Sequence, residues 1–288
     1  MILYIVSLLF LSIHKRHIYN RINMEKIEKK LITKFLKIAE KGYIKGINNS
    51  DNSVGLTFED ELGKSPDSSF LPDYKNIEIK CKTRFSRFPI SLFAKSFDGP
   101  TDFEMRRLLL TYGKPDSEFK SKYLLQGNVY ANKMTLIYEN YFQFDVNRKD
   151  KKIYLLIYDK NKNIIEKISY VNFYSLKKRI LAKLTNLCFV CASKKKEYGN
   201  LFFRYYKISI YRIKSFEKFL CLLEDGKISI NLCGRVARSG ERIGRQQNKN
   251  MVFKIPRYYI SELFDKKFEF DYDKYISRNK KCFNNHIF

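Results

Sequence analysis

The sequence has little histidine, and what it has lies near the ends of the chain. Its 3 histidines are His14, His17 and His286. A Ser-His-Asp triad, a Cys-His dyad, an HNH nuclease site and a histidine-ligated zinc each need histidine in the body of the fold. Those chemistries are therefore excluded there, and carboxylates and lysines are left as the groups that can carry a reaction.

Acidic residues are scarce relative to basic ones. The 288 residues include 56 Lys and Arg against 30 Asp and Glu, which gives a formal net charge of +26. An AT-rich coding sequence would raise the lysine count, but it does not account for so few acids. A positive field of this size favours a polyanion, and DNA, RNA and anionic membrane all stay open on charge alone.

Cysteines are few and scattered. Cys188 and Cys191 form a C-x-x-C pair, but no second pair or nearby histidine completes a zinc site. The apolar residues between them instead predict a buried strand. Free cysteines of this kind are typical of a reducing compartment, so we expect the protein in the cytoplasm.

Long apolar runs and flexible linkers are also missing. The apolar run at 1–13 is too short to span a bilayer and lacks the flanks of a signal peptide. We expect residues 1–23 to be a mis-annotated start or a flexible segment, with a membrane tether as the minority interpretation and no stable membrane partner. No repeat and no Pro- or Gly-rich linker occurs, which predicts two lobes of one folding unit, 24–190 and 191–270. A polar tail follows at 271–288, and its stretch 279–285 is expected to be disordered or to contact phosphate.

Apolar periodicity predicts a mixture of helices and strands, hence an α/β chain. The predicted helices lie at 25–40, 58–62, 103–112, 175–187, 216–223 and 258–264. The predicted strands lie at 76–83, 88–94, 141–146, 153–158, 164–168, 189–192, 201–210 and 228–232.

The strand at 76–83 carries the strongest chemical signal. Its residues alternate, so Glu78 and Lys80 share one face, and Asp73 stands just upstream, where a short turn or an adjoining strand would bring its carboxylate beside Glu78. Two carboxylates and a lysine suit Mg²⁺-assisted phosphodiester hydrolysis, because Mg²⁺ prefers hard oxygen ligands and lysine stabilises developing negative charge. The pattern alone is weak, since a solvated strand face in a lysine-rich chain often carries Glu-x-Lys.

The surrounding residues resemble the MvaI/BcnI family of restriction endonucleases, relatives of the MutH nickase within the PD-(D/E)xK superfamily. The matching blocks appear in the order Gly55-Leu-Thr-Phe-Glu59, Leu62-Gly63, Leu71-Pro-Asp73, Ile77-Glu-Ile-Lys80 and Ile90-Ser-Leu-Phe93, and they resume at Arg238-Ser-Gly240 through Gly244 to Phe253. The resemblance implies a PD-(D/E)xK, MutH-like mixed sheet flanked by helices, with two lobes around a DNA cleft. In that reading, 24–190 is the catalytic lobe and 191–270 the DNA-recognition lobe.

The resemblance also implies roles for individual residues. Asp73 and Glu78 become Mg²⁺ ligands, Lys80 the catalytic lysine and Glu59 a supporting carboxylate. The implied activity is that of a monomeric type II enzyme acting on double-stranded DNA beside a cognate DNA methyltransferase. A strand-nicking endonuclease of mismatch repair and an inactive DNA-binding protein on the same fold are the alternatives, although all four catalytic candidates are intact.

A second polar stretch supplies side chains suited to reading DNA bases. Arginine pairs with guanine in the major groove, and Gln and Asn pair with adenine. The stretch from Arg235 to Asn250 can also be interpreted as an exposed polar hairpin without a DNA contact. Lys82 can likewise be interpreted as a lysine that only contacts solvent. The candidate DNA contacts are Lys82, Arg84, Arg87, Arg235, Arg238, Arg242, Arg245, Gln246, Gln247, Asn248 and Asn250.

The chain departs from the family pattern within this stretch. Residues 248–252 read Asn-Lys-Asn-Met-Val where His-Asp-His-Gly-Thr is expected. Two potential base-contacting histidines are therefore absent, so the target sequence cannot be copied from the family's prototypes.

Overall fold

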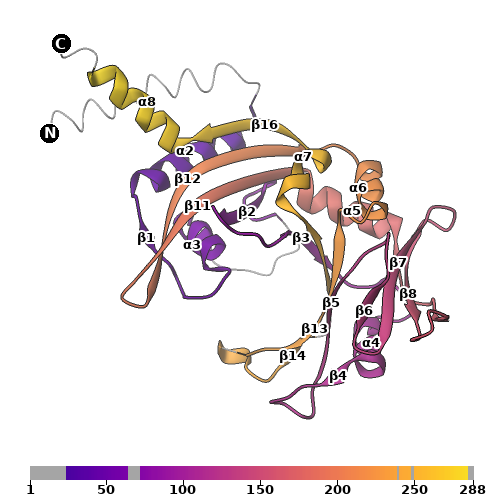
Figure 1. Ribbon diagram of the computed structural model, residues 1–288. Coiled ribbons are helices and arrows are strands. Elements are labelled where there is room, and N and C mark those ends of the chain that lie inside the picture. Colours follow the sequence, from indigo (N-terminus) through magenta and orange to yellow (C-terminus); the bar gives the residue numbers. More distant parts are fainter. Residues whose placement is uncertain (1–23, 64–71, 239, 248–249, 285–288) are drawn as a thin grey trace. The chain divides into compact units, whose positions relative to one another are not determined.

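The computed structural model describes residues 24–63, 72–238, 240–247 and 250–284, without the side chains of 279–284 (Figure 1). The segment at 1–23, whose origin the sequence left open, lies outside the described residues. No helix within the described part is long and apolar enough to cross a membrane.

The chain divides into two compact units, each assembled from separated stretches. Unit 1 comprises Met1–Ser86, Asn186–Tyr211 and Lys266–Phe288, and unit 2 comprises Arg87–Thr185 and Arg212–Asp265. The expected boundary between residues 190 and 191 falls inside a single strand, β11 (Asn186–Glu197). That strand pairs with β2 (Glu78–Thr83), and hydrogen-bonded neighbours belong to one sheet, so the units are interleaved along the sequence instead of consecutive.

Unit 1 is built on a five-stranded sheet. Its order is β1 (Ile44–Lys45), β12 (Asn200–Ile213), β11 and β2, with β16 (Phe264–Asp271) also paired to β12. β2 and β11 run parallel, with Lys80 opposite Phe189 in the register. The strand predicted at 76–83 is confirmed, and Cys188 and Cys191 lie buried in β11 as predicted.

Two helices, α2 (Lys26–Glu40) and α3 (Ser53–Glu61), pack on this sheet through a shared apolar core (Figure 1). Three aromatic rings meet in that core. The Phe58 ring centroid lies 6.5 Å from that of Phe35 and 5.0 Å from that of Tyr205. The buried Tyr205 hydroxyl donates to the Val54 carbonyl of α3 at 2.8 Å. This bond ties α3 to the sheet that carries β2.

Unit 2 contains two further sheets. One has the order β10 (Tyr170–Asn172), β8 (Lys152–Tyr158), β7 (Asn140–Asn147) and β6 (Thr135–Ile137), with β9 (Ile164–Glu166) on β8. The other has the order β3 (Ile90–Lys95), β15 (Met251–Ile255), β13 (Ser229–Val236), β5 (Tyr123–Val129) and β4 (Lys114–Pro115), with β14 (Gln246–Gln247) on β13. Its helices are α4 (Glu104–Tyr112), α5 (Phe173–Leu184), α6 (Phe216–Glu224) and α7 (Ile260–Leu263).

The C-terminal region differs from the sequence prediction. The expected polar tail at 271–288 is helix α8 (Tyr272–Asn284) over its described part, and the expected helix at 258–264 shortens to a 3-10 turn, Arg257–Tyr259, and α7, followed by β16. Tyr272 packs against the unit 1 core, and Arg204 of β12 donates to both carboxylate oxygens of Asp273, at 2.6 Å and 2.8 Å. These contacts with distant residues hold α8, and no local pattern reveals them.

Candidate active site

A tight turn places Asp73 against the start of β2. Tyr74 and Ile77 exchange two backbone hydrogen bonds of 2.9 Å and 2.8 Å, and Lys75 between them takes a positive φ of 55°. The turn folds the four-residue spacer back on itself. The Asp73 Oδ2 atom can then accept the backbone N–H of Ile79 at 3.0 Å. The short turn expected upstream of the strand is present, and it fixes one carboxylate at the strand's first residues.

Glu78 and Lys80 meet on one face of β2. The Lys80 Nζ atom donates to Glu78 Oε1 at 2.6 Å. The Glu78 side chain is only 4% exposed, whereas that of Lys80 is 23% exposed. A carboxylate withdrawn from water needs a cationic or hydrogen-bonding partner, because burial without one costs several kcal/mol, on the order of 3–5. Lys80 is such a partner, and its side chain is still partly exposed.

Glu59 approaches the same strand from α3. Its neighbour Phe58 is fully buried in the unit 1 core, while Glu59 itself is partly exposed. The pKa of Cys81 on β2 is raised, first by burial and then by the Cys188 thiol. The negative charges of Glu59 and Asp73 raise it further. Both carboxylates therefore lie within electrostatic range of the middle of β2.

The donors at this position fit a hard divalent cation. Across the residues described, no group of three or more His, Cys, Asp or Glu side chains is arranged to hold a metal. Mg²⁺, however, keeps several waters and is commonly held by one or two carboxylates together with substrate phosphate. Asp73 and Glu78 supply two carboxylates near the start of β2: Glu78 is its first residue, and Asp73 accepts the N–H of its second, Ile79.

The candidate DNA contacts that follow this strand are divided between the units. Lys82 lies on β2 and is partly buried. The backbone N–H of Arg84 donates to the Ala192 carbonyl at 2.9 Å, and its side chain is exposed. Arg87 is exposed and is the first residue of unit 2.

Two of the predicted base-reading residues face each other across the β13–β14 ladder in unit 2. Arg235 and Gln247 are register partners, and Arg235 Nε donates to Gln247 Oε1 at 2.7 Å. Gln246 instead points to the backbone: its Nε2 donates to the Tyr123 carbonyl at 2.9 Å and its Oε1 accepts the Tyr123 N–H at 3.0 Å. Gln246 therefore joins β14 to β5.

Arg238 is anchored within unit 2 by Asp116, a residue that the sequence analysis missed. The guanidinium donates to both carboxylate oxygens, with Nη1 to Oδ1 at 3.0 Å, and Asp116 Oδ1 also accepts the backbone N–H groups of Glu118 and Phe119 at 2.9 Å each. The Arg238 hydrogen bond is the main cause that lowers the pKa of Asp116 to about 2. The Pro115-Asp116-Ser117 sequence signals an Asx turn, but nothing local indicates an arginine 122 residues away.

The remaining predicted contacts have different surroundings. Arg242 and Arg245 are exposed and lie in the hairpin that follows β13. Two backbone hydrogen bonds close this hairpin: the Gly244 N–H donates to the Ala237 carbonyl at 2.9 Å, and the Ala237 N–H donates to the Arg245 carbonyl at 3.0 Å. The Asn250 Oδ1 accepts the Ser96 hydroxyl at 2.8 Å. Asn248 lies outside the described residues.

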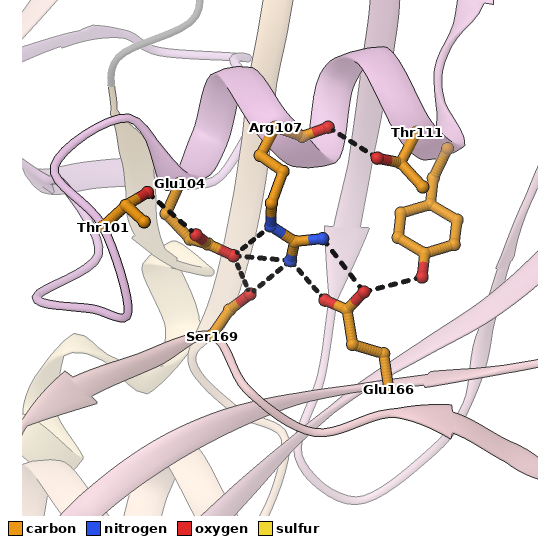
Figure 2. Close-up of polar contacts among 7 residues, drawn as sticks. Thr101, Glu104, Arg107, Thr111, Glu166 and Ser169 are labelled. Atoms are coloured by element: carbon orange, nitrogen blue, oxygen red, sulfur yellow. Dashed lines mark hydrogen bonds and ion pairs between the residues drawn. The ribbon is translucent and has the colours of Figure 1, made fainter.

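A second cluster of carboxylates lies in unit 2, around Arg107 (Figure 2). Arg107 Nε donates to Glu104 at 2.9 Å, its Nη1 donates to Glu166 at 3.0 Å, and its Nη2 contacts both carboxylates. Ser169 donates to Glu104 at 2.6 Å, and the Tyr112 hydroxyl donates to Glu166 at 2.7 Å. Burial favours the neutral form of Glu104, but the hydrogen bonds from Arg107 and Ser169 outweigh it and lower the pKa of Glu104.

This cluster is a structural brace. Its two carboxylates share one guanidinium and are hydrogen-bonded by hydroxyls, so their oxygens are already occupied by protein donors. The contacts join α4 to the β9–β10 segment of the first unit 2 sheet. On its other side α4 presses Leu109 against β13, where a Cβ on Gly234 would lie 2.7 Å from Leu109 Cδ1. The brace therefore supports the strand that carries Arg235.

Comparison with known proteins identifies the fold. The MvaI/BcnI restriction endonuclease family model matches residues 32–264. The structure is similar to that of the restriction endonuclease MvaI in complex with its cognate DNA substrate, with 23% identity, a TM-score of 0.80 and coverage of 85% of this chain and 99% of that one. It is also similar to MvaI in the absence of DNA, with 20% identity, a TM-score of 0.53 and coverage of 85% and 98%.

A search of the curated proteins found no match. The likeness to the MvaI structures shows a PD-(D/E)xK-type fold, as the sequence predicted. The family match covers most of the sequence, from α2 to β16. The chain therefore belongs to the MvaI/BcnI family of restriction endonucleases, which are site-specific deoxyribonucleases.

Proposed function

We propose that this chain is a type II restriction endonuclease that uses Mg²⁺ to hydrolyse duplex DNA at a short specific sequence. The observation that carries the proposal is the grouping of Asp73, Glu78 and Lys80 at the start of β2, with Asp73 locked to the strand backbone and Lys80 paired with a buried carboxylate. Family membership supports the nuclease activity, and the relative solved with its cognate DNA supports duplex DNA as substrate.

Asp73 and Glu78 are the proposed ligands of Mg²⁺, which when bound would polarise the scissile phosphate and acidify water. Lys80 supplies positive charge where negative charge develops on the phosphate during attack. Its contact with Glu78 holds the ammonium in place, and its partial exposure lets it reach a phosphate. Glu59 adds negative potential beside the strand and supports cation binding from α3.

The exposed arginines supply the proposed DNA contacts. Arg84 and Arg87 follow the catalytic strand, and Arg242 and Arg245 lie on the hairpin after β13. The Arg235–Gln247 pair presents a guanidinium and an amide side by side, which suits hydrogen bonding to adjacent base edges. Arg238 and Gln246 hold the hairpin in shape through Asp116 and the β5 backbone.

A protective methyltransferase is the partner that such an activity requires, because unmodified host sites would otherwise be cut. We propose that the protein acts as a monomer, as its resemblance to the MvaI/BcnI family suggests. Sedimentation of the protein bound to a duplex that carries its recognition site tests this proposal, because a monomer gives a complex with one protein chain per duplex.

The test of the proposed function is cleavage of unmethylated phage DNA by the full-length protein with Mg²⁺. Lys80→Ala removes the proposed catalytic ammonium, and EDTA removes the metal. Lys37→Ala is the matched control, because Lys37 is an exposed lysine on α2, in the same unit. We expect discrete double-strand fragments from the wild type and from Lys37→Ala, and none from Lys80→Ala or with EDTA.

The pattern of products distinguishes the alternatives. Sequencing the fragment ends would give the recognition site and the cut position. Nicked products alone would replace the type II assignment with a strand-nicking activity. Salt-sensitive DNA binding without cleavage under any divalent metal would sink the enzyme proposal and leave a DNA-binding protein on this fold.

A further inference from the structure

An aromatic side chain stands in solvent directly after the catalytic strand. The Phe85 ring is 86% exposed, two residues beyond the end of β2. Single exposed apolar residues are common and need no explanation. This one is distinguished by its neighbours, because Arg84 precedes it and its guanidinium lies 5.6 Å from the ring centroid.

The backbone around Phe85 is fixed. The Arg84 N–H donates to the Ala192 carbonyl at 2.9 Å, which anchors the turn to β11. The Ser86 N–H donates to the Thr83 carbonyl at 3.2 Å, which closes the turn around Phe85. The ring is therefore presented from a defined position on unit 1, and little backbone entropy would be lost when it meets a ligand.

Phe85 also lies close to the proposed catalytic residues along the chain. It follows Lys80 by five residues, and five extended residues span at most about 17 Å. One helical turn of DNA measures about 34 Å. Phe85 therefore lies no further from Lys80 than about half a helical turn of DNA.

We propose that Phe85 is a wedge that packs its ring against a base step of the bound duplex and unstacks it. This inference rests on the proposed function. A phenyl ring has no donor or acceptor, so it senses how easily a step is deformed and not which bases compose it. Arg84 contributes the charge that draws the phosphate backbone to the ring, in keeping with the +26 net charge of the chain.

The test uses the full-length protein with Ca²⁺ in place of Mg²⁺, on a duplex that contains the cleavage site mapped as above. 2-Aminopurine is placed at each position in turn, because its fluorescence rises when it unstacks. We expect a rise at one step with the wild type and none with Phe85→Ala. Kd should rise by no more than about 150-fold, because the lost stacking of roughly 1–3 kcal/mol is partly offset by the unstacking cost that the variant no longer bears.

Two further variants sharpen the result. Phe103→Ala is the matched control, because Phe103 is a phenylalanine that is 71% exposed in unit 2, at the start of α4. Its Kd and fluorescence should equal those of the wild type. Phe85→Leu keeps an apolar wedge and should retain part of the fluorescence rise, which a purely structural role would not predict.

Three outcomes would overturn the inference. A fluorescence rise that persists unchanged in Phe85→Ala, with circular dichroism showing a folded protein, would mean that the ring is not what unstacks the DNA. Weaker binding without any fluorescence rise in the wild type would mean contact without unstacking. A wild type that neither binds nor cleaves DNA would instead overturn the proposed function itself, and the wedge with it.

Discussion

Replacing Arg107 by methionine should destabilise unit 2 by about 3 kcal/mol. The Glu104 side chain is 1% exposed and that of Glu166 is 12% exposed, and both are paired with this one guanidinium. Breaking a buried ion pair by removing one partner costs roughly 3–5 kcal/mol, because a charge is left without compensation. Arg107 is itself 31% exposed and Ser169 still donates to Glu104, so the lower end applies.

Urea unfolding at pH 7, followed by circular dichroism, would measure this loss. Arg106→Met is the matched control, because Arg106 is the neighbouring residue on α4 and is exposed. Its effect should stay within about 0.5 kcal/mol, as is usual for surface substitutions.

The pH dependence follows from the direction of the Glu104 shift. Its pKa in the fold lies below the ordinary value of 4.5, so its stabilising contribution is fully present above pH 4.5 and is lost as the pH falls through the folded value. The stability difference between wild type and Arg107→Met should therefore narrow on acidification below pH 4.5.

The reasoning would be refuted by a difference that is small at pH 7 or that widens in acid. The double variant Glu104→Gln with Arg107→Met adds a second check, because a neutral amide needs no cation. It should recover part of the lost stability. If the two substitutions were simply additive, the ion pair would not be the source of the effect.

Three other changes have defined consequences. Asp116→Asn should leave the protein folded but reduce discrimination between the mapped site and single-base variants in cleavage, because Arg238 loses its charged anchor. The pKa of Asp116 is about 2 in the fold, so the Asp116–Arg238 contribution to stability should be lost as the pH falls from about 4 to 2. Urea unfolding at a series of pH values measures this loss. Gly234→Ala should lower stability by roughly 1–3 kcal/mol in urea unfolding, because its Cβ would lie 2.7 Å from Leu109 Cδ1 and 3.1 Å from the Leu125 carbonyl oxygen. Tyr205→Phe should cost about 1 kcal/mol by the same assay, since the hydrogen bond to the Val54 carbonyl is lost, and an unchanged midpoint would contradict that.

Local patterns were sufficient for the catalytic strand. Alternation at 76–83 predicted β2, and the turn-forming spacer predicted that Asp73 returns toward it. Both features depend on neighbours within about six residues. The apolar filling between Cys188 and Cys191 likewise predicted a buried strand, because a short apolar run is enough to specify one.

Elements fixed by distant partners were missed. β16 reads Phe-Asp-Lys-Lys-Phe-Glu-Phe-Asp, which has no sustained alternation, and it is a strand because β12 offers it an edge. β5 contains Gly127 and Asn128 in its second half, and it forms because β13 pairs with it along five register positions. The contact between Asp116 and Arg238 depends on the same tertiary pairing, which is why a residue that shapes the candidate DNA-reading hairpin could not be found from its own surroundings.

The parallel pairing of β2 with β11 has a consequence for synthesis on the ribosome. Leu187 faces Glu78 in the register and follows it by 109 residues, the difference between the two positions. At about 5–20 residues per second, the strand with Glu78 and Lys80 waits on the order of 5–20 s before its neighbour emerges. During that interval the whole first stretch of unit 2, Arg87–Thr185, is made. The pairing of β2 is thus completed only after most of the chain exists, so a truncated nascent chain carries the proposed catalytic residues without the sheet that positions them.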